Sequence, residues 1–578
     1  MVSIIKDKIK TFRINKVFII LLFTILFTSI PLFFDSILYG HDIGFHLNRI
    51  QGIANALSSS QFPVRIHAFV LHDFGQAAPI LYPELFLYIP AFLRMLGVSL
   101  ITSYFSFILL VNAATCCISY FCFKRLFNSK YPGLIITVLY AFSIYRLTNI
   151  YLRSACGEAL AMAFFPLIIY GMYEIFFGDE KNWKFAAAGF TCILQSHILS
   201  TLITVFFTII FILIFIRIVK QKTRLKALVK TGFWVLAINL WFIIPFLQFY
   251  FHENLNLGAL IWANLHEQSA YLSQILAVFA HGTGRSQPLG IIQDEMSFAI
   301  GFPLISGSFL FIYSLNYRNY ISRPKYFNMG CFFLVLGLFC IMASSNIFPW
   351  QSLSKFIPAL NIIQFVWRFL AFAAISLAIA AGSGIILIAK NIEQRKYMLI
   401  IIISISVLCA SYYLTSYMNN PVYLRKSDAL DSMSALGGGE YLPSNTNTGE
   451  IKEKNSTFVL NNNASVLNYV KNGTNIFLNY SSTEPQANDY IEVPLLYYSG
   501  YQALWNNSSR LKTEKGNNNS LRILLPDESE GSLTIKYRGF LIWDIANIVS
   551  CLAFLLFVYI SLPERYRRFT VRGSFCSA

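Results

Sequence analysis

Apolar runs long enough to cross a lipid bilayer recur along this chain, and they constrain its fold more than any other feature. Examples are the runs 17–34, 202–216, 331–343 and 398–410, the last three extended by apolar flanks. A membrane-spanning helix needs about 20 mostly apolar residues. Hydrophobic residues make up 56% of the chain and charged residues only 13%, and a soluble surface could not hide so much apolar area. The sequence therefore predicts an α-helical polytopic membrane protein.

The net charge of +17 raises the question of nucleic-acid binding, so the positions of the charges matter. Seven short segments carry 26 of the 45 Lys and Arg residues but only five acidic residues, which leaves the rest of the chain at −4. These segments are 1–16, 124–130, 179–184, 217–230, 318–325, 390–396 and 563–578. Basic residues gather in the cytoplasmic loops of membrane proteins. We therefore place the seven segments in the cytoplasm and expect no nucleic-acid partner.

Helices placed between these basic segments and the other loops predict 12 membrane spans in the cell membrane, with both termini cytoplasmic. The predicted spans are 17–37, 100–123, 131–150, 158–177, 185–198, 199–217, 229–250, 297–315, 327–346, 367–389, 397–417 and 541–561. If the further apolar stretch 80–97 crossed the membrane, the basic segment 124–130 would lie outside, so we place 80–97 in the outer interface. No small-residue cleavage site follows Phe34, which favours an uncleaved first helix.

Two long segments lie on the predicted exterior face. The first is the loop 36–99, and the second is 418–540, where short alternating runs are broken by Asn-Gly and Gly. This alternation predicts a small β-rich domain of the sandwich type. The predicted organisation is a transmembrane module over 1–417, the β-rich domain over 418–540, and a last helix with a cytoplasmic tail over 541–578. The ten cysteines show neither a disulfide framework nor a metal-binding spacing.

The first exterior loop opens with polar residues at helical spacing. Asp42, His46 and Arg49 fall at i, i+4 and i+7, on one face of a helix. A carboxylate, an imidazole and a guanidinium at a membrane surface suit a reaction on an anionic lipid head group, with Asp as general base and the other two neutralising phosphate. The alternative is a helix-capping Asp, an interfacial His and a solvated Arg. A metal site from His41, Asp42 and His46 lacks clear further ligands.

Other charged residues lie on the same predicted face. Glu84, which follows Tyr-Pro, is either a second acid or a charge at a helix start. Arg146, Arg153 and Glu158 lie between the third and fourth spans, where charges are costly unless they are paired or used. A structural pair between Arg153 and Glu158 is the alternative there.

Two more candidates flank later spans. His197 lies at the exterior tip of a helical hairpin. It has either a structural role there or a role in substrate binding. Arg368 leads into the tenth span and suits the gripping of a lipid phosphate. Alternatively, Trp367 belongs to the aromatic belt and Arg368 snorkels to the interface. The gathering of these residues on one face favours a functional site.

At these residues the chain resembles the bacterial YfhO-like family, also described as pyruvoyl-tetrahydropterin-synthase-related membrane proteins. The motifs that carry the resemblance are HDIGFHLNRI at 41–50, QFPVR at 61–65, YPEL at 82–85, RSACGE at 153–158, QFVWRF at 364–369, EYLP at 440–443 and LYYSGY at 496–501. These motifs occur in the family's order and extend over nearly the whole chain. Val366 and Ser499 stand where proline is expected, which puts local geometry in doubt. The pterin description implies a soluble zinc enzyme, which this chain does not resemble.

The family is similar in layout to the GT-C glycosyltransferases, and this likeness implies roles for the candidates. Asp42 would be the catalytic base, and His46 and Arg49 follow it in the matching motif. Arg153, Glu158 and Arg368 would help to hold the donor phosphate.

The resemblance implies an integral-membrane glycosyltransferase that moves a sugar from a polyprenyl-phosphate donor to a glycan or other cell-envelope polymer. Transfer would take place on the outer face of the cytoplasmic membrane, among membrane lipids. The resemblance specifies no cofactor, and a divalent cation is compatible with it. The alternatives are a transporter or flippase of a lipid-linked or polar substrate, and a non-catalytic envelope assembly factor. Tyr497, Tyr498, Tyr501 and Trp505 are expected either to stack on the acceptor or, as we favour, to form the core of the β-rich domain.

Overall fold

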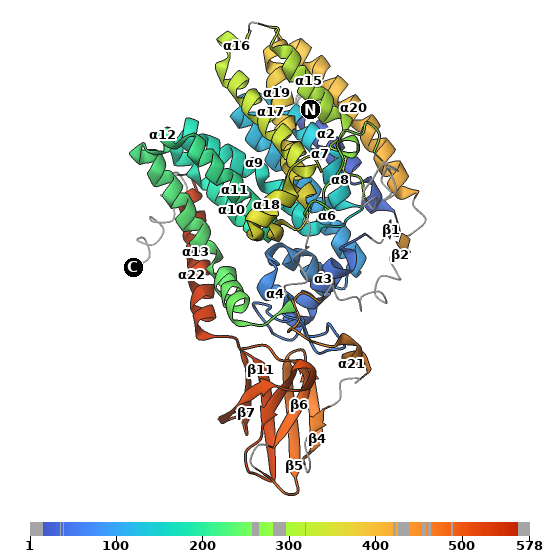
Figure 1. Cartoon of the computed structure of the whole chain (residues 1–578), viewed down its shortest axis with the longest axis vertical. Helices are drawn as coiled ribbons and strands as arrows, with labels where there is room; N and C mark the ends of the chain where they lie inside the picture. The colour runs from blue at the N-terminus through green and yellow to red at the C-terminus, as the bar shows by residue number, and fades with distance from the viewer. Residues whose placement is uncertain are drawn as a thin grey trace, which may run out of the picture. The chain divides into compact units, whose positions relative to one another are not determined.

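The computed structural model is mostly helical and carries a small β-sheet domain (Figure 1). It describes residues 15–34, 36–38, 40–256, 265–280, 296–317, 319–419, 423–425, 439–453, 458–460, 464–486 and 489–563. The chain groups into two compact units. Unit 1 comprises Met1–Ile43, Phe105–Glu174 and Trp262–Ser427, and unit 2 comprises Gly44–Tyr104, Ile175–Ile261 and Asp428–Ala578.

Unit 1 is built from helices. They are α2 (Lys16–Thr28), most of α6 (Leu100–Leu126), α7 (Lys130–Ala141), α8 (Ile144–Ile150), most of α9 (Cys156–Phe177), α14 (Leu272–Ile275), α15 (Phe302–Ser314), α16 (Asn319–Ser322), α17 (Pro324–Ser344), α18 (Trp350–Phe356), α19 (Phe369–Ile388) and α20 (Ile392–Met418). Two short antiparallel strands, β1 (Ser36–Leu38) and β2 (Tyr423–Arg425), pair with each other.

Helix α19 is the centre of unit 1. It packs against α17, α15 and α7, as Figure 1 shows, and almost all of its residues are buried. Small residues allow this close packing, as is usual for helix interfaces in membranes. At Gly384 a Cβ atom would lie 2.6 Å from the backbone of Phe311 on α15, so only glycine fits the contact. This packing holds α19 within unit 1, and Arg368 lies just before its first residue.

Unit 2 combines helices with the β-sheet domain. Its helices are nearly all of α3 (Ile43–Ser58), then α4 (Ala78–Leu81), α5 (Tyr88–Met95), α10 (Trp183–Leu194), α11 (Ile198–Ile214), α12 (Ile216–Val219), α13 (Lys222–His252), α21 (Thr448–Glu453) and α22 (Leu541–Ser561). Helix α13 runs beside α22 and also packs against α10 (Figure 1).

The β-sheet domain consists of two antiparallel sheets that share one core. Its strands are β3 (Val459–Leu460), β4 (Ala464–Asn472), β5 (Asn475–Ser482), β6 (Tyr490–Leu496), β7 (Tyr501–Trp505), β8 (Ser509–Leu511), β9 (Thr513–Lys515), β10 (Ser520–Leu524) and β11 (Glu530–Tyr537). The strand orders are β3-β6-β10-β9 and β4-β5-β11-β7-β8. Alternate residues of both sheets, such as Leu478 and Ile523, enter the same buried cluster. This arrangement agrees with the expected β-rich domain of the sandwich type.

Each of the 12 predicted spans overlaps a helix, the third of them α7 and α8 together. The first span, 17–37, also runs into strand β1, and 297–315 begins before α15. In the described part of the chain, seven helices are long and apolar enough to cross a membrane: α6, α9, α13, α17, α19 with its preceding turn, α20 and α22. The number rises to eight if α7 and α8, which are bent by 52°, form one span. The helices at the other predicted spans, α2, α10, α11 and α15, are shorter. The count of 12 crossings therefore stays a prediction.

Candidate active site

Asp42 lies just before α3, where the chain passes closely over the 152–154 segment of unit 1. The Asp42 amide donates a hydrogen bond to the Arg153 carbonyl at 2.9 Å. A Cβ atom at Gly40 would lie 2.6 Å from both the Leu152 carbonyl oxygen and the Ser154 hydroxyl, so glycine is needed for this approach. The backbone thus holds Asp42 beside Arg153.

Glu158, in the first turn of α9, is the anchor of this cluster. Its Oε1 accepts hydrogen bonds from the Tyr145 hydroxyl at 2.8 Å and from Asn149 Nδ2 at 3.0 Å. Its Oε2 accepts from Arg153 Nη1 at 2.8 Å. The Arg153–Glu158 pair that the sequence offered as a structural alternative is therefore present. Donors contact both oxygens, so Glu158 orients its neighbours.

Arg153 and Arg368 supply the positive charge. Arg153 Nη1 also donates to Asn149 Oδ1 at 2.5 Å, and no described residue accepts a hydrogen bond from its Nε or Nη2. Arg368 Nε lies 3.7 Å from Glu158 Oε2, while its Nη1 donates to the Ile363 carbonyl at 2.7 Å. Arg368 is buried, and Trp367 beside it is buried too.

The carboxylate of Asp42 differs from that of Glu158 because no described residue donates a hydrogen bond to it or forms an ion pair with it. No N–H group of α3 caps it, so the capping alternative lacks its hydrogen bond. The side chain keeps some solvent exposure, although protein surrounds most of it. Burial raises the pKa of Asp42, with a contribution from Glu158, and the nearby charges of Arg153, His41 and Arg368 offset only part of this effect.

Arg146 lies apart from this group of charges. It is fully buried in α8, where Nη2 donates to Asn112 Oδ1 at 2.6 Å and to Thr115 Oγ1 at 3.1 Å. Its Nη1 donates to the Ala141 carbonyl at 3.1 Å. These contacts give Arg146 a structural role that ties α8 to α6. A substrate-binding role for Arg146 stays a prediction.

A second buried cluster, in unit 2, contains the remaining candidates. Arg49 Nε pairs with Glu84 Oε1 at 2.8 Å, and Arg49 Nη2 donates to the Pro83 carbonyl at 2.6 Å. The guanidinium lies 4.1 Å from the centre of the Tyr82 ring. Glu84 Oε2 accepts from His67 Nε2 at 3.1 Å. Glu84 thus contacts Arg49 and His67 and makes no capping hydrogen bond at the helix start.

The protonation of Glu84 follows from these contacts. Burial alone would raise the pKa of Glu84, but His67 and Arg49 outweigh burial and hold it below its ordinary value of 4.5. Glu84 therefore carries a full negative charge near neutral pH. Arg49 is satisfied on all three nitrogens, since Nη1 also contacts His46 Nδ1 at 3.2 Å.

His46 holds a neutral imidazole. A guanidinium can only donate, so Nδ1 of His46 must accept from Arg49, and the ring proton lies on Nε2. Burial, Arg49 and His197 hold the pKa of His46 well below its ordinary value of 6.5. His46 therefore offers a hydrogen-bond donor and no positive charge.

His197 caps α11. Its Nδ1 accepts from the Ser200 amide at 3.2 Å, and its ring lies 6.0 Å from that of Tyr82. These contacts give His197 a structural role, and its substrate-binding role stays a prediction.

The structure thus divides the predicted site residues into two groups. Asp42, Arg153, Glu158 and Arg368 come together in unit 1, with Arg146 elsewhere in that unit. The second group is His46, Arg49, Glu84 and His197 in unit 2.

Sequence reasoning missed three polar partners. Tyr145 and Asn149 lie four residues apart on α8, so their shared helical face was a readable signal. His67 lies in an irregular part of the loop 36–99, and nothing in its local pattern ties it to Glu84.

The aromatic residues that were expected to stack on an acceptor or to form the β-domain core lie in or against that core. Tyr498 and Tyr501 are buried, and Tyr497 and Trp505 pack against the same core. This is the outcome that the sequence analysis favoured.

The described residues do not fit a divalent cation well. Among them, no group of three His, Cys, Asp or Glu side chains is placed to hold a metal ion. In the Asp42 cluster both oxygens of Glu158 are already bound to donors. Asp42 alone provides too few oxygen ligands for such an ion.

Comparisons with known proteins give few relatives. No protein-family model matches the chain. An uncharacterised protein of Lactococcus lactis subsp. cremoris (strain MG1363) is 26% identical over 352 residues, which are 58% of this chain and 54% of that protein. The chain therefore spans about half the length of this curated relative. Membership of the YfhO-like family stays a prediction.

Two solved structures are similar to parts of the chain. One is the archaeal oligosaccharyltransferase AglB from Archaeoglobus fulgidus in complex with an inhibitory peptide and a dolichol-phosphate, with a TM-score of 0.37 and 12% identity. The match covers 75% of this chain and 61% of AglB. The other is the apo form of an Archaeoglobus fulgidus oligosaccharyltransferase, with a TM-score of 0.33, 13% identity, and coverage of 74% and 57%.

Proposed function

We propose that this protein is a membrane glycosyltransferase that uses Asp42 as its catalytic base. The donor would be a sugar on a polyprenyl phosphate, and the acceptor a hydroxyl group of a cell-envelope polymer on the outer face of the membrane. The observation that carries the proposal is the Asp42 carboxylate. It has no partner among the described residues, yet it lies next to two arginines that Glu158 orients.

The state of Asp42 suits proton transfer. A general base works best when its pKa lies closer to the operating pH, and burial raises the pKa of Asp42 in that direction. Asp42 as a residue keeps some solvent exposure, and an acceptor hydroxyl group would approach the carboxylate from that side. Because no described donor occupies its oxygens, their lone pairs are available to the incoming proton.

The arginines suit the leaving group. In the proposed step, the acceptor oxygen forms a bond to the sugar C1 atom and gives its proton to Asp42. The bond from C1 to the phosphate oxygen breaks, and the lipid phosphate leaves with the electron pair. Guanidinium groups stabilise a developing phosphate anion by charge-assisted hydrogen bonds. The unused Nε and Nη2 of Arg153 provide such donors within the described part of the site.

The charges of the cluster are consistent with this step. Asp42 and Glu158 balance Arg153 and Arg368 before reaction. When Asp42 takes up the proton, the cluster gains one net positive charge. The gain coincides with the extra negative charge on the leaving phosphate, which favours the transition state over the ground state.

The test is sugar transfer by the purified protein in lipid, supplied with polyprenyl-phosphate-linked sugars and envelope acceptors. Asp42→Asn is expected to reduce kcat by about 100-fold or more, the usual contribution of a general base. Asp527→Asn is the matched control, because Asp527 is an exposed aspartate on the β-sheet domain and has no ion-pair partner among the described residues. It should keep wild-type turnover.

Each outcome has a clear meaning. If Asp42→Asn keeps pace with the control while the wild type is active, Asp42 is not the base. If the wild type binds the donor lipids without turning any over, the transferase proposal itself is wrong, and transport or scaffolding is the better function.

A further inference from the structure

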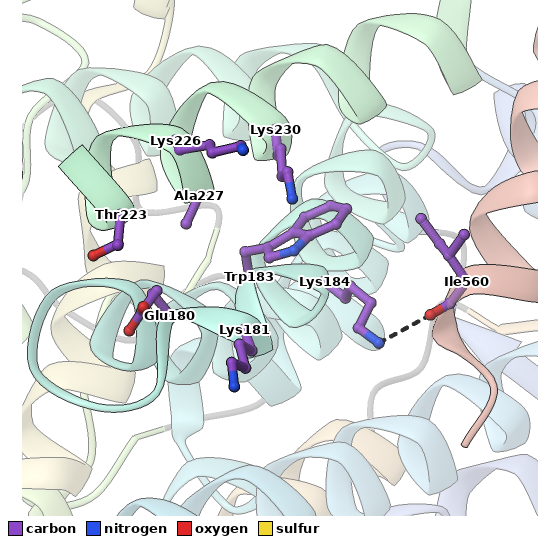
Figure 2. Close-up of a pocket in the computed structure, with 9 residues that line it drawn as sticks. All are labelled: Glu180, Lys181, Trp183, Lys184, Thr223, Lys226, Ala227, Lys230 and Ile560. Atoms are coloured by element: carbon purple, nitrogen blue, oxygen red, sulfur yellow. Dashed lines mark hydrogen bonds between the residues drawn. The ribbon is translucent and has the colours of Figure 1, made fainter. Parts of the chain in front are cut away.

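A groove of about 480 Å³ in unit 2 is lined by lysines. None of its lining residues is a candidate site residue. Its wall is formed by residues from the start of α10, the start of α13 and the end of α22, as Figure 2 shows. The lining residues are Glu180, Lys181, Trp183, Lys184, Thr223, Lys226, Ala227, Lys230 and Ile560. A volume of roughly 300–1,000 Å³ is typical of small-molecule sites.

The charge of the groove is strongly one-sided. Four lysines and one acid, Glu180, line it. Lys226 and Lys230 are one helical turn apart on α13, and like charges at that spacing repel each other. Both are exposed, and neither forms an ion pair with any residue that the structure describes. Such an arrangement is unfavourable unless an anion is bound.

The four lysines of the groove make different contacts. Lys184 Nζ donates to the Ile560 carbonyl at 3.1 Å, drawn as the dashed line in Figure 2. It thereby satisfies one of the open carbonyls at the C-terminal end of α22. Lys230 Nζ lies 5.9 Å from the centre of the Trp183 ring. Lys181, Lys226 and Lys230 therefore remain to contact a ligand.

The apolar part of the groove points to a lipid. Trp183 is buried between α10 and α13 and lies 6.1 Å from Phe557 of α22. Helices α13 and α22 are two of the apolar helices long enough to cross a membrane, and the groove lies at their ends. Tryptophan is enriched at this level of the bilayer, where lipid phosphates also lie.

We infer that this groove is a binding site for an anionic phospholipid, with the head-group phosphate on Lys181, Lys226 and Lys230. The glycerol backbone and the first acyl carbons lie against Trp183. Basic pockets between membrane helices bind anionic head groups in this way. The chain's own tail is a poor occupant, since 564–578 carries four arginines and one acid. The ligand thus links the ends of α10, α13 and α22.

The test measures lipid binding to the full-length protein by native mass spectrometry from a mild detergent. The probes are phosphatidylglycerol, phosphatidylcholine and soluble glycerol phosphate. Wild type is expected to prefer phosphatidylglycerol. Each lysine near a membrane surface contributes a factor of about five to the binding of anionic lipid, so Lys226→Gln with Lys230→Gln should weaken this binding about 25-fold.

The matched control is Lys390→Gln with Lys396→Gln, which removes two exposed lysines from another predicted cytoplasmic segment outside the groove. It should bind phosphatidylglycerol as tightly as wild type. Brominated phosphatidylglycerol should also quench tryptophan fluorescence in wild type, and less so in Trp183→Phe.

Three results would overturn the inference. The first is equal weakening in both double variants, which means a general charge effect. The second is equal binding of phosphatidylcholine. The third is competition by glycerol phosphate at the same concentration as the lipid, which means a site for a free anion. Both double variants should unfold at the wild-type temperature, which shows that a change in lipid binding does not come from a change in folding.

Discussion

Replacing Glu84 by glutamine should destabilise the protein, because Glu84 balances the buried charge of Arg49. The two side chains are 4% and 2% exposed, and their ion pair is 2.8 Å long. Glutamine has nearly the same shape but leaves the guanidinium without a counter-ion. Breaking a buried pair from one side costs about 3–5 kcal/mol. We expect the lower value of about 3 kcal/mol, since Arg49 keeps its contacts with Pro83, His46 and Tyr82.

An exposed pair in the β-sheet domain supplies the control. Glu514 lies 3.5 Å from Lys512, and the two side chains are 33% and 72% exposed. Glu514 also lies 3.7 Å from Arg522, which is 22% exposed. Exposed pairs contribute about 0–1 kcal/mol, so Glu514→Gln should change stability little. The assay is thermal unfolding of both variants in one mild detergent, followed by tryptophan fluorescence. The midpoint should fall at least about three times as far for Glu84→Gln as for Glu514→Gln.

A second substitution separates charge from packing. Adding Arg49→Met to Glu84→Gln removes the uncompensated charge and keeps an unbranched apolar side chain in its place. The double variant should regain part of the lost stability, because replacing a whole buried pair by apolar groups is often neutral. Equal drops for Glu84→Gln and Glu514→Gln, or a double variant as unstable as the sum of its singles, would refute the reasoning.

Three further outcomes follow from the geometry. The pKa of His46 is held below 6.5 in the folded protein, so the unfolded state binds more protons. Stability should therefore fall as the pH drops below about 6.5. In His46→Gln the unfolding midpoint should depend less steeply on pH. Glu158 helps to raise the pKa of Asp42, so Glu158→Gln should move the acidic limb of kcat/KM to lower pH. Gly384→Ala should cost about 1–3 kcal/mol by overpacking, whereas Gly232→Ala, with open space around its Cβ position, should be neutral or stabilising in the same thermal assay.

The sequence predicted the helices well, because a long apolar run restricts the chain to few structures. Every predicted span overlaps a helix, although 17–37 ends on strand β1. Of the alternating runs in 418–540, 476–480, 521–525 and 533–537 overlap strands β5, β10 and β11, whereas 495–498 overlaps only the end of β6. Strands β4, β7, β8 and β9 were missed. The side chains of β4 and β8 are largely exposed, so the alternation that marks a half-buried strand is weak there.

The site was predicted less completely, because residue types identify candidates but not their partners. The spacing of Asp42, His46 and Arg49 suggested one catalytic face. The structure adds partners that this spacing did not predict: Arg49 pairs with Glu84, and Asp42 lies among the charges around Glu158. The common catalytic face stays a prediction. Which carboxylate is satisfied and which is open depends on contacts between residues up to hundreds of positions apart, and helical spacing carries no information on them.

The contrast among three carboxylates supports the choice of Asp42. Glu84 and Glu158 are each bound by donors on both oxygens, and the pKa of Glu84 is lowered despite its burial. Asp42 has no donor among the described residues, and its pKa is raised. A carboxyl group whose pKa is higher in the folded than in the unfolded protein destabilises the fold once it is ionised.

Asp42 therefore costs stability at neutral pH, as reactive groups often do. Asp42→Asn removes that cost, so its unfolding midpoint at pH 7 should equal or exceed that of wild type. Below the unfolded pKa of about 3.9 the advantage should vanish, because Asp42 is then protonated in both states. A midpoint at pH 7 well below that of wild type would mean that Asp42 holds the fold together. Its raised pKa would then have no bearing on catalysis.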